Sequence, residues 1–175
     1  GLGNKFLSHI REVDAIIHLV RCFESDKITH VNSKINPVDD LETIKTEIIL
    51  SDLDIIQKKL EKGKKKLLQD KEVKILEEKL SQLNEGKEVI VKDEFEKKFL
   101  SNMGLLSIKP KIIVCNVDEE SLTNGNAFTE SVKKTYSNEK IVTICADIED
   151  QIMSLDNNER ETFMKEIGLN KTGLN

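Results

Sequence analysis

The sequence lacks any apolar run long enough to cross a membrane. Spanning a bilayer as a helix takes roughly 20 consecutive apolar residues, and no stretch of the 175 residues approaches that length. The first residues also lack the pattern of a signal peptide. We therefore expect a cytoplasmic protein with no membrane partner.

Cysteine is scarce, and its three copies are far apart in the chain: Cys22, Cys115 and Cys145. This spacing suggests neither a disulfide framework nor a zinc site. The three histidines likewise have no partners at the spacing of metal ligands. Each cysteine lies at or near the end of an apolar run, so we expect small buried hydrophobic side chains near one edge of a sheet.

An excess of positive charge is also missing. The chain has 27 Lys and Arg against 32 Asp and Glu, a net charge of −5. This balance argues against a simple electrostatic nucleic-acid binder, and we expect no DNA partner, although a local basic patch is compatible with it. Charges of both signs alternate along the chain, as is typical of solvated helix faces.

The most informative stretch is KIIVCNVDE, residues 111–119. A continuous apolar run after Pro110 that stops at a polar Asn116 is typical of a buried parallel strand whose carboxyl end opens onto a site. Asn116 and Glu119 then lie at the end of the strand. Their Asn-x-x-acidic spacing resembles the base-recognition motif Asn-Lys-x-Asp of P-loop GTPases.

Two positions depart from that motif, because Val117 replaces the Lys and Glu119 replaces the Asp. The short Asp carboxylate of the family accepts hydrogen bonds from the ring N–H and the exocyclic amine of guanine. Adenine instead presents an N7 acceptor beside an N6 amine donor, which an Asn amide can match. The departures therefore favour ATP over GTP.

Further landmarks extend the resemblance over nearly the whole chain. They are GLGNKFL (1–7), RCFE (21–24), THV (29–31), NPVDD (36–40), the motif at 116–119 and GLN (173–175). As a set they resemble the YchF-type ATPases of the Obg family. The fold implied is α/β, part of a P-loop NTPase G domain with a mostly parallel sheet and an inserted antiparallel helical coiled coil.

The phosphate-binding loop of that family, Gly-x-x-x-x-Gly-Lys-[Ser/Thr], is absent from the sequence. No Ser/His/Asp or Cys/His set is suggested by the spacing either. We therefore assign no catalytic residues and no metal ligands here. Because the chain starts without Met and ends on Gly-Leu-Asn, we interpret it as an internal fragment lacking the P-loop and a C-terminal domain.

The helical arm is predicted from apolar spacing. Residues 36–40 begin a helix with an Asp cap, and apolar positions continue to about Leu68. A helix of that length extends on the order of 45 Å at 1.5 Å per residue, so its far part projects. Residues 69–71 form the predicted turn, and Val73, Leu76, Leu80 and Leu83 supply the partner stripe, which stops at residues 84–86. Lysines 58, 59, 62 and 64–66 near the tip are either a solubilising face or a contact for RNA or an acidic partner.

The remaining elements complete the predicted domain. We expect strands at 15–23 and 140–145, and helices at 4–13, 93–106, 128–136, 149–154 and 156–167. For helix 4–13 we expect Asn4 to be the cap, and we expect Gly1 and Gly3 to form a hinge before it. In helix 93–106 the residues expected to pack on the core are Phe95, Phe99, Met103 and Leu106. Phe23 ends the first strand, and it either walls the base pocket or packs in the core. The predicted segments are a G domain at 1–44 and 106–175 with a coiled-coil insertion at 45–105.

In this interpretation Asn116 hydrogen-bonds the adenine edge, Val117 covers the ring or offers a backbone contact, and Glu119 orients the Asn or the loop. The resemblance implies an ATP- and Mg²⁺-dependent switch ATPase linked to translation, with ribosome or RNA bound through the arm and metal ligands outside this chain. The fragment alone is expected to be inactive. Two alternatives are a non-catalytic helical-hairpin interaction module and a GTPase with a relaxed base motif.

Overall fold

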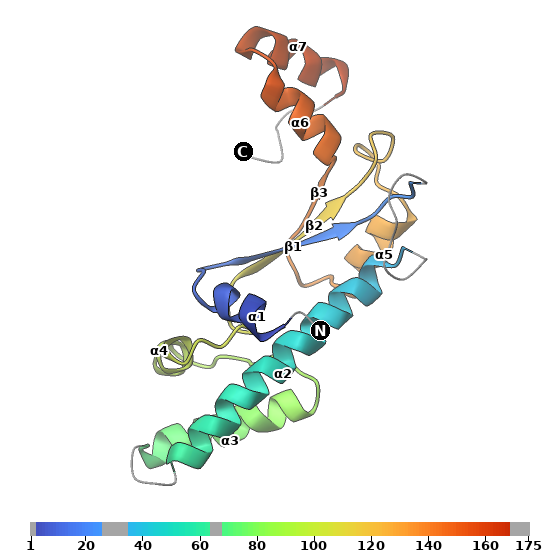
Figure 1. The fold of residues 1–175 in the computed structure, drawn as a ribbon. Coiled ribbons are helices and arrows are strands. Elements are labelled where there is room, and N and C mark those ends of the chain that lie inside the picture. The colour runs from blue at the N-terminus through green and yellow to red at the C-terminus, as the bar shows by residue number, and fades with distance from the viewer. Residues whose placement is uncertain (1–2, 26–34, 64–67, 169–175) are drawn as a thin grey trace. The chain divides into compact units, whose positions relative to one another are not determined.

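The computed structural model describes residues 3–25, 35–63 and 68–168 (Figure 1). Its elements are α1 (Asn4–Arg11), β1 (Ile16–Arg21), α2 (Pro37–Gly63), α3 (Asp70–Asn84), α4 (Glu94–Asn102), β2 (Lys111–Asn116), α5 (Ala127–Thr135), β3 (Ile141–Ile144), α6 (Ala146–Ser154) and α7 (Asn157–Glu166). The predicted α/β class is confirmed. Among the helices described, none is both long and apolar enough to cross a bilayer.

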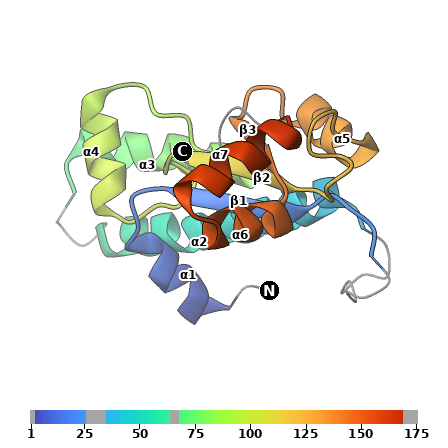
Figure 2. The same cartoon turned by 90° about the horizontal axis from the view of Figure 1, so that it is seen from above.

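The chain divides into two compact units. One comprises residues 1–16 and 42–110, and the other comprises residues 17–41 and 111–175. The first unit is helical, and the second contains most of the sheet with α5, α6 and α7 (Figures 1 and 2). Helix α2 contributes residues to both units.

The sheet has three strands in the order β1-β2-β3. β2 and β3 pair in parallel, from Ile113 opposite Ile141 to Asn116 opposite Ile144. The backbone of β1 runs in the same direction, because a hydrogen bond joins Cys22 N–H to Asn116 C=O (2.7 Å) just beyond its last residue and Ile16 N–H bonds to Pro110 C=O (2.9 Å) at its start. All three carboxyl ends therefore meet at one edge, as the sequence predicted.

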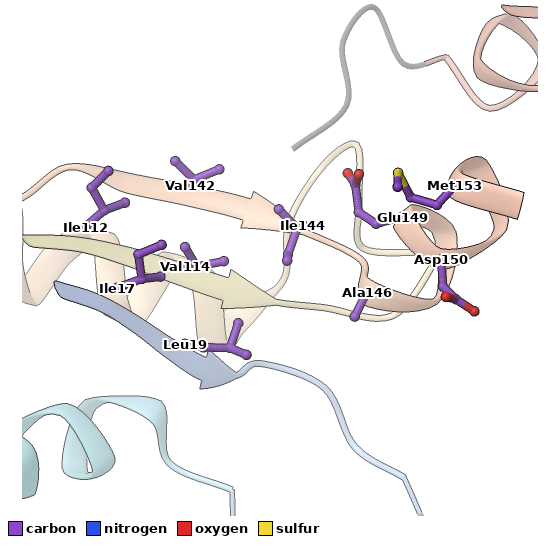
Figure 3. Close-up of a pocket in the computed structure, with 10 residues that line it drawn as sticks. All are labelled: Ile17, Leu19, Ile112, Val114, Val142, Ile144, Ala146, Glu149, Asp150 and Met153. Atoms are coloured by element: carbon purple, nitrogen blue, oxygen red, sulfur yellow. The ribbon is translucent and has the colours of Figure 1, made fainter. Parts of the chain in front are cut away.

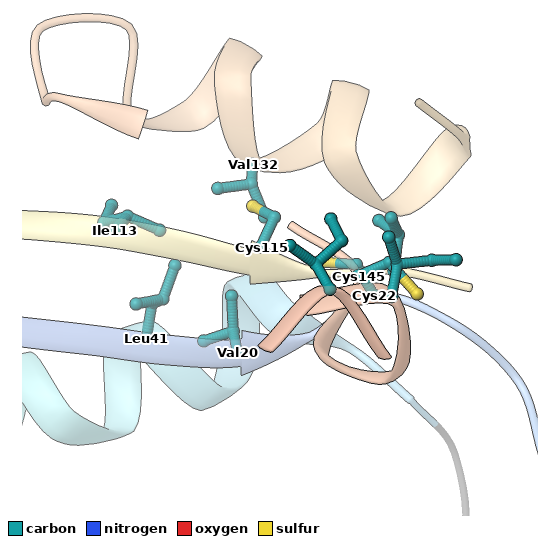
Figure 4. Packing of buried hydrophobic residues seen from close by; sticks show 10 residues of the cluster. Val20, Cys22, Leu41, Ile113, Cys115, Val132 and Cys145 are labelled. Carbon is teal, nitrogen blue, oxygen red and sulfur yellow. The ribbon is translucent and has the colours of Figure 1, made fainter. Parts of the chain in front are cut away.

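One face of the sheet is covered by helices. Successive parallel strands are joined by right-handed crossovers, and two crossovers that advance in the same direction place their helices on the same face. Figure 4 shows the resulting core, in which strand residues such as Val20 and Ile113 meet Leu41 of α2 and Val132 of α5. The three cysteines are buried in this cluster and carry free thiols, which confirms their expected packing role.

The opposite face of the sheet is open. Ile17 and Leu19 of β1 keep 69% and 60% of their surface exposed, whereas the alternate residues His18 and Val20 are buried. With Ile112, Val114, Val142 and Ile144 from the neighbouring strands they line a hollow of about 530 Å³ (Figure 3). The first turns of α6, reaching to Met153, close one end of it. The two crossovers leave this face uncovered.

The helical unit contains the predicted hairpin. Ile49 and Ile56 of α2 share one buried cluster with Ile75, Leu76 and Leu83 of α3, and α3 ends before Gly86, whose φ of 72° suits a helix stop. Two details of the prediction are wrong. The start of α2 is capped by the side chain of Asn36 rather than by an Asp, and residues 70 and 71 lie inside α3 rather than in the turn. Lysines 64–66 lie outside the described residues.

Helix α4 is shorter than predicted. Glycine at position 104 adopts φ 73° and the helix stops at Asn102, so Leu106 is buried beyond the helix rather than on it. Its most buried apolar residue is Leu100, whereas Phe95 remains 43% exposed and stacks on Phe99. The prediction that Phe95 packs on the core is therefore wrong. The buried positions of α4 are Glu96 and Leu100, each one residue after the predicted positions Phe95 and Phe99.

The two ends of the described chain also form helices. The predicted cap Asn4 is wrong, because Gly3 is the N-cap of α1, with φ 79°, and Asn4 is its first helical residue. A hinge at Gly3 remains a prediction, and Gly1 lies outside the described residues. Leu7 of α1 packs with Ile48 and Leu106. At the other end α6 begins at Ala146, three residues earlier than predicted, and α7 begins after the predicted cap Asp156, whose carboxylate accepts from the N–H groups of residues 158 and 159.

Candidate functional site

The three strand ends are connected by hydrogen bonds at the carboxyl edge of the sheet. The N–H group of Cys22, just after β1, donates to the carbonyl of Asn116 at the end of β2 (2.7 Å). The side chain of Asn116 in turn accepts the N–H of Ala146 at Oδ1 (2.9 Å). Asn116 therefore links the loops that follow all three strands.

The bond to Ala146 also fixes how the Asn116 amide is turned. Because Oδ1 faces the first N–H of α6, the NH₂ group points the other way, and within the described residues it makes no hydrogen bond of its own. An amide oxygen has a second lone pair. Asn116 can therefore still donate through Nδ2 and accept once more through Oδ1, which is what an adenine edge requires.

Val117 has its side chain inside the protein. It is 2% exposed and belongs to the core cluster on the covered face of the sheet, while its N–H donates to the carbonyl of Ile144 (2.8 Å). The side chain of Val117 points to the same face of the sheet as those of Ile113 and Cys115, because side chains alternate between the two faces along a strand. The prediction that this side chain covers the purine ring does not agree with that packing. Of the two predicted roles, only a contact through the backbone remains.

Glu119 is exposed, and among the described residues no side-chain hydrogen bond joins it to Asn116. Its neighbour Asp118 makes a side-chain bond within the loop, because Asp118 Oδ1 accepts the N–H of Ser121 (3.0 Å). The carboxylate of Asp118 was not predicted as a loop residue. A role for Glu119 in orienting the Asn or the loop remains a prediction.

Phe23 lies at the same edge of the sheet and is half-buried. The guanidinium of Arg21 stands 4.9 Å from the ring centroid, and its Nε donates to the Phe23 carbonyl (3.0 Å). The ring is thus held in place from the preceding strand without belonging to the buried core cluster. This position is compatible with a wall of the predicted base pocket, which remains a prediction.

The sequence reasoning missed Asn126. Its side chain donates from Nδ2 to the Cys22 carbonyl (2.7 Å) and accepts at Oδ1 from the N–H groups of Phe128 and Thr129 (both 3.1 Å). The signal was present, since an Asn followed three residues later by a Thr before an apolar stretch is a helix N-cap pattern. The cap could be predicted, whereas the bond to a residue 104 positions away could not.

The buried thiol of Cys22 at this edge suits packing rather than chemistry. The Cys115 side chain is hydrogen-bonded to Cys22, and this bond together with burial raises the pKa of Cys22 well above its ordinary value. The Cys22 thiol therefore stays protonated at neutral pH and is a poor nucleophile. No group of three or more His, Cys, Asp or Glu in the described part of the chain is placed to hold a metal ion.

Comparisons with known proteins place the chain among close relatives. It is 38% identical over 185 residues to the ribosome-binding ATPase YchF of Bacillus subtilis (strain 168), covering 99% of this chain and 50% of that protein. It is 40% identical over 184 residues to the protein of the same name from Escherichia coli O157:H7, covering 100% and 50%. The chain thus spans about half the length of these relatives.

A solved structure agrees with the sequence comparison. The fold matches the structure titled as the Schizosaccharomyces pombe YchF GTPase with a TM-score of 0.87 and 26% identity, over 99% of this chain and 50% of that one. No family model matches the sequence. The arrangement of strands and helices described above is therefore the one found in that structure.

Proposed function

The chain belongs to the YchF family, and on that premise we propose that it forms the base-recognition and helical-arm part of a nucleotide-dependent switch protein. The full-length protein binds ATP with Mg²⁺, hydrolyses it and associates with the ribosome. The matched bacterial relatives carry the name ribosome-binding ATPase. They are about twice as long as this chain, so the activity belongs to the longer protein.

One observation carries the proposal: the position and the orientation of Asn116. Ligands of open parallel sheets bind at the carboxyl ends of the strands, and Asn116 stands at that edge with its Oδ1 fixed by Ala146 N–H (2.9 Å). Its Nδ2 donates to purine N7, and the remaining lone pair of Oδ1 accepts from the N6 amine. Phe23 lines the slot from the neighbouring strand, and Glu119 projects from the loop beyond.

The preference for ATP over GTP rests on the same amide. Purine N7 is common to both nucleotides, so the selectivity that this amide can supply comes from position 6, where adenine offers a donor and guanine an acceptor. A second lone pair on Asn116 Oδ1 suits the donor. The names of the relatives point to both nucleotides, since the bacterial proteins are called ATPases and the yeast structure is titled a GTPase. A relaxed GTPase is therefore the second candidate.

The domain organisation is part of the proposal. Residues 1–44 and 106–175 contribute to a G domain, and residues 45–105 form the inserted arm, a coiled coil whose basic tip contacts the ribosome or RNA. A parallel sheet occurs almost only with both faces covered, and the open face of this sheet exposes Ile17 and Leu19. We propose that helices from the rest of the G domain cover that face, and that its remaining strands extend the sheet at an edge. The Mg²⁺ ligands lie in the same missing part.

The test is a competition assay on the full-length protein, in which ATP and GTP displace a fluorescent nucleotide in the presence of Mg²⁺. We expect ATP to bind more tightly than GTP. Asn116→Ala should weaken ATP binding by about tenfold, because loss of a hydrogen bond between uncharged groups that leaves the partner unpaired changes the binding free energy by roughly that factor. Asn158→Ala, at an exposed position of α7, is the matched control and leaves the affinity unchanged.

The alternatives give different results in the same assay. Tighter binding of GTP supports the relaxed GTPase. If the full-length protein binds neither nucleotide, the chain is a non-catalytic module whose working surface is the helical hairpin.

A further inference from the structure

Asn126 uses both halves of its side-chain amide. The oxygen caps α5 by accepting from the N–H groups of Phe128 and Thr129. The nitrogen donates to the Cys22 carbonyl at 2.7 Å and lies 3.2 Å from the hydroxyl oxygen of Ser121. A residue that only capped the helix would need the oxygen alone. The nitrogen therefore makes a second connection, from the loop after β2 to the end of β1.

The backbone around Asn126 is locked by its neighbours. The hydroxyl of Thr129, which is fully buried, accepts the Asn126 N–H and donates to the Asn126 carbonyl (both 2.8 Å). Gly125 adopts φ 72°, and a Cβ at that position would stand 2.6 Å from the Thr129 hydroxyl oxygen. These contacts fix the backbone from which the Asn126 side chain reaches Cys22.

The connection holds the segment that carries Phe23. Cys22 is bonded through both backbone groups, its N–H to the Asn116 carbonyl (2.7 Å) and its carbonyl to Asn126 Nδ2 (2.7 Å). The next residue is Phe23, whose carbonyl and ring are held by Arg21. Removal of the Asn126 bond would leave the Cys22 carbonyl, in a buried residue, without this donor and would release the loop from the strand end.

We propose that Asn126 is a positioning residue for the base site: its amide sets the spacing between the Phe23 segment and the loop of residues 117–125 that carries Glu119. The inference rests on the proposed function, because it concerns the slot in which the adenine ring would lie. Asn126 itself does not touch the nucleotide. It acts through Cys22 and the loop.

The two roles of Asn126 can be separated by substitution. Asp and Ser are helix caps about as good as Asn, so Asn126→Asp and Asn126→Ser keep the cap of α5, but neither supplies a donor that reaches Cys22. Asn126→Ala removes both functions. Asp156→Ala removes the corresponding cap of α7, where the structure shows no connection to the site, and so reports the effect of losing a cap alone.

The experiment measures the affinity of the full-length protein and its variants for ATP and for inorganic tripolyphosphate, together with their melting temperatures. We expect Asn126→Asp and Asn126→Ser to weaken ATP binding by about tenfold while tripolyphosphate binding stays within error of the wild type. Because both variants keep the cap but leave the Cys22 carbonyl without its donor, their melting temperatures should fall less than that of Asn126→Ala. Asn126→Ala should lose ATP affinity and stability, and Asp156→Ala should lose stability alone.

Other outcomes overturn the inference. If both cap-retaining variants bind ATP as the wild type does, or lose ATP and tripolyphosphate affinity equally, Asn126 has only a structural role. If the wild-type protein binds no nucleotide, the proposed function fails, and this inference fails with it. If the wild type binds ATP but the variants do not differ from it as expected, only this inference fails.

Discussion

Asp52 is the residue whose contacts hold the start of the segment that leads into β2. Its side chain is fully buried in α2 and accepts three hydrogen bonds, from Leu106 N–H (2.9 Å), Ser107 N–H (2.8 Å) and the Ser107 hydroxyl (2.6 Å). Asp52→Asn replaces one acceptor by an NH₂ group that faces donors. We expect the free energy of unfolding to fall by about 1–3 kcal/mol, measured by urea denaturation. Asp54→Asn, at an exposed position of the same helix, should change it by less than about 0.5 kcal/mol.

Burial also gives Asp52 a pH dependence. Desolvation raises the pKa of its carboxyl group above the ordinary value, although the hydrogen bonds and the nearby Arg11 act in the opposite direction. The native state then binds the proton more strongly than the unfolded state. The contribution of Asp52 to the unfolding free energy therefore falls as pH rises from the ordinary pKa through the raised one, and the Asp52→Asn variant lacks this slope. A contribution that instead grows over that interval would contradict the assignment.

Sequence reasoning at the residue scale succeeded where the pattern itself was local. The position of Asn116 followed from an apolar run that stops at a polar residue, and the cap of α7 at Asp156 followed from a short spacing. The interior position of Val117 could have been read from strand alternation. The bonds from Asn126 to Cys22 and from Asp52 to Ser107 span 104 and 55 positions, and single-sequence patterns contain no information about such partners.

At the scale of elements, α3 and α4 are joined by an ion pair inside the protein. Lys79 is fully buried in α3, and its ammonium group lies 2.9 Å from Glu96 Oε2 of α4 and 2.8 Å from the Ile90 carbonyl. Lys79→Met leaves Glu96 charged and without its partner. We expect a loss of about 3–5 kcal/mol in the free energy of unfolding. The exposed pair Lys58–Asp54 provides the control, since Lys58→Ala should cost less than about 1 kcal/mol.

A second substitution separates loss of the pair from loss of packing. Adding Glu96→Gln to Lys79→Met removes the stranded charge but keeps an oxygen for the Lys92 N–H, which Glu96 accepts at 3.0 Å. The double variant should therefore be more stable than Lys79→Met alone. Equal stability of the two variants would mean that the charge of Glu96 is not the cause of the loss.

The elements themselves were largely predictable, and the errors have separate causes. Helices and strands with a clear apolar period were located to within a few residues, including β2 and α7. The end of α4 was missed because Gly104 stops the helix while the apolar spacing continues past it. Lys79 is charged, and interspersed charges were treated as typical of solvated helix faces without this residue being singled out. Its burial depends on Glu96 and on the Ile90 carbonyl, which only the fold brings to it.

For the whole molecule, the open face of the sheet leads to opposite expectations for the isolated chain and the full-length protein. Ile17, Leu19 and Met153 are 60–69% exposed around the hollow, and apolar patches of this kind favour association. The double substitution Ile17→Lys with Leu19→Glu makes this face polar while the alternate residues His18 and Val20 keep their buried contacts. In the isolated 175-residue chain we expect self-association to decrease, as measured by analytical ultracentrifugation.

In the full-length protein the same double substitution should be harmful. Under the proposed domain organisation the rest of the G domain covers this face, so two charges would be buried without partners, and both the melting temperature and ATP affinity should fall. The isolated chain should bind ATP poorly with or without the substitution, because it lacks the phosphate loop. If the substituted full-length protein keeps its stability and its ATP affinity, the open face is exposed in that protein too. The rest of the polypeptide would then have to be placed elsewhere.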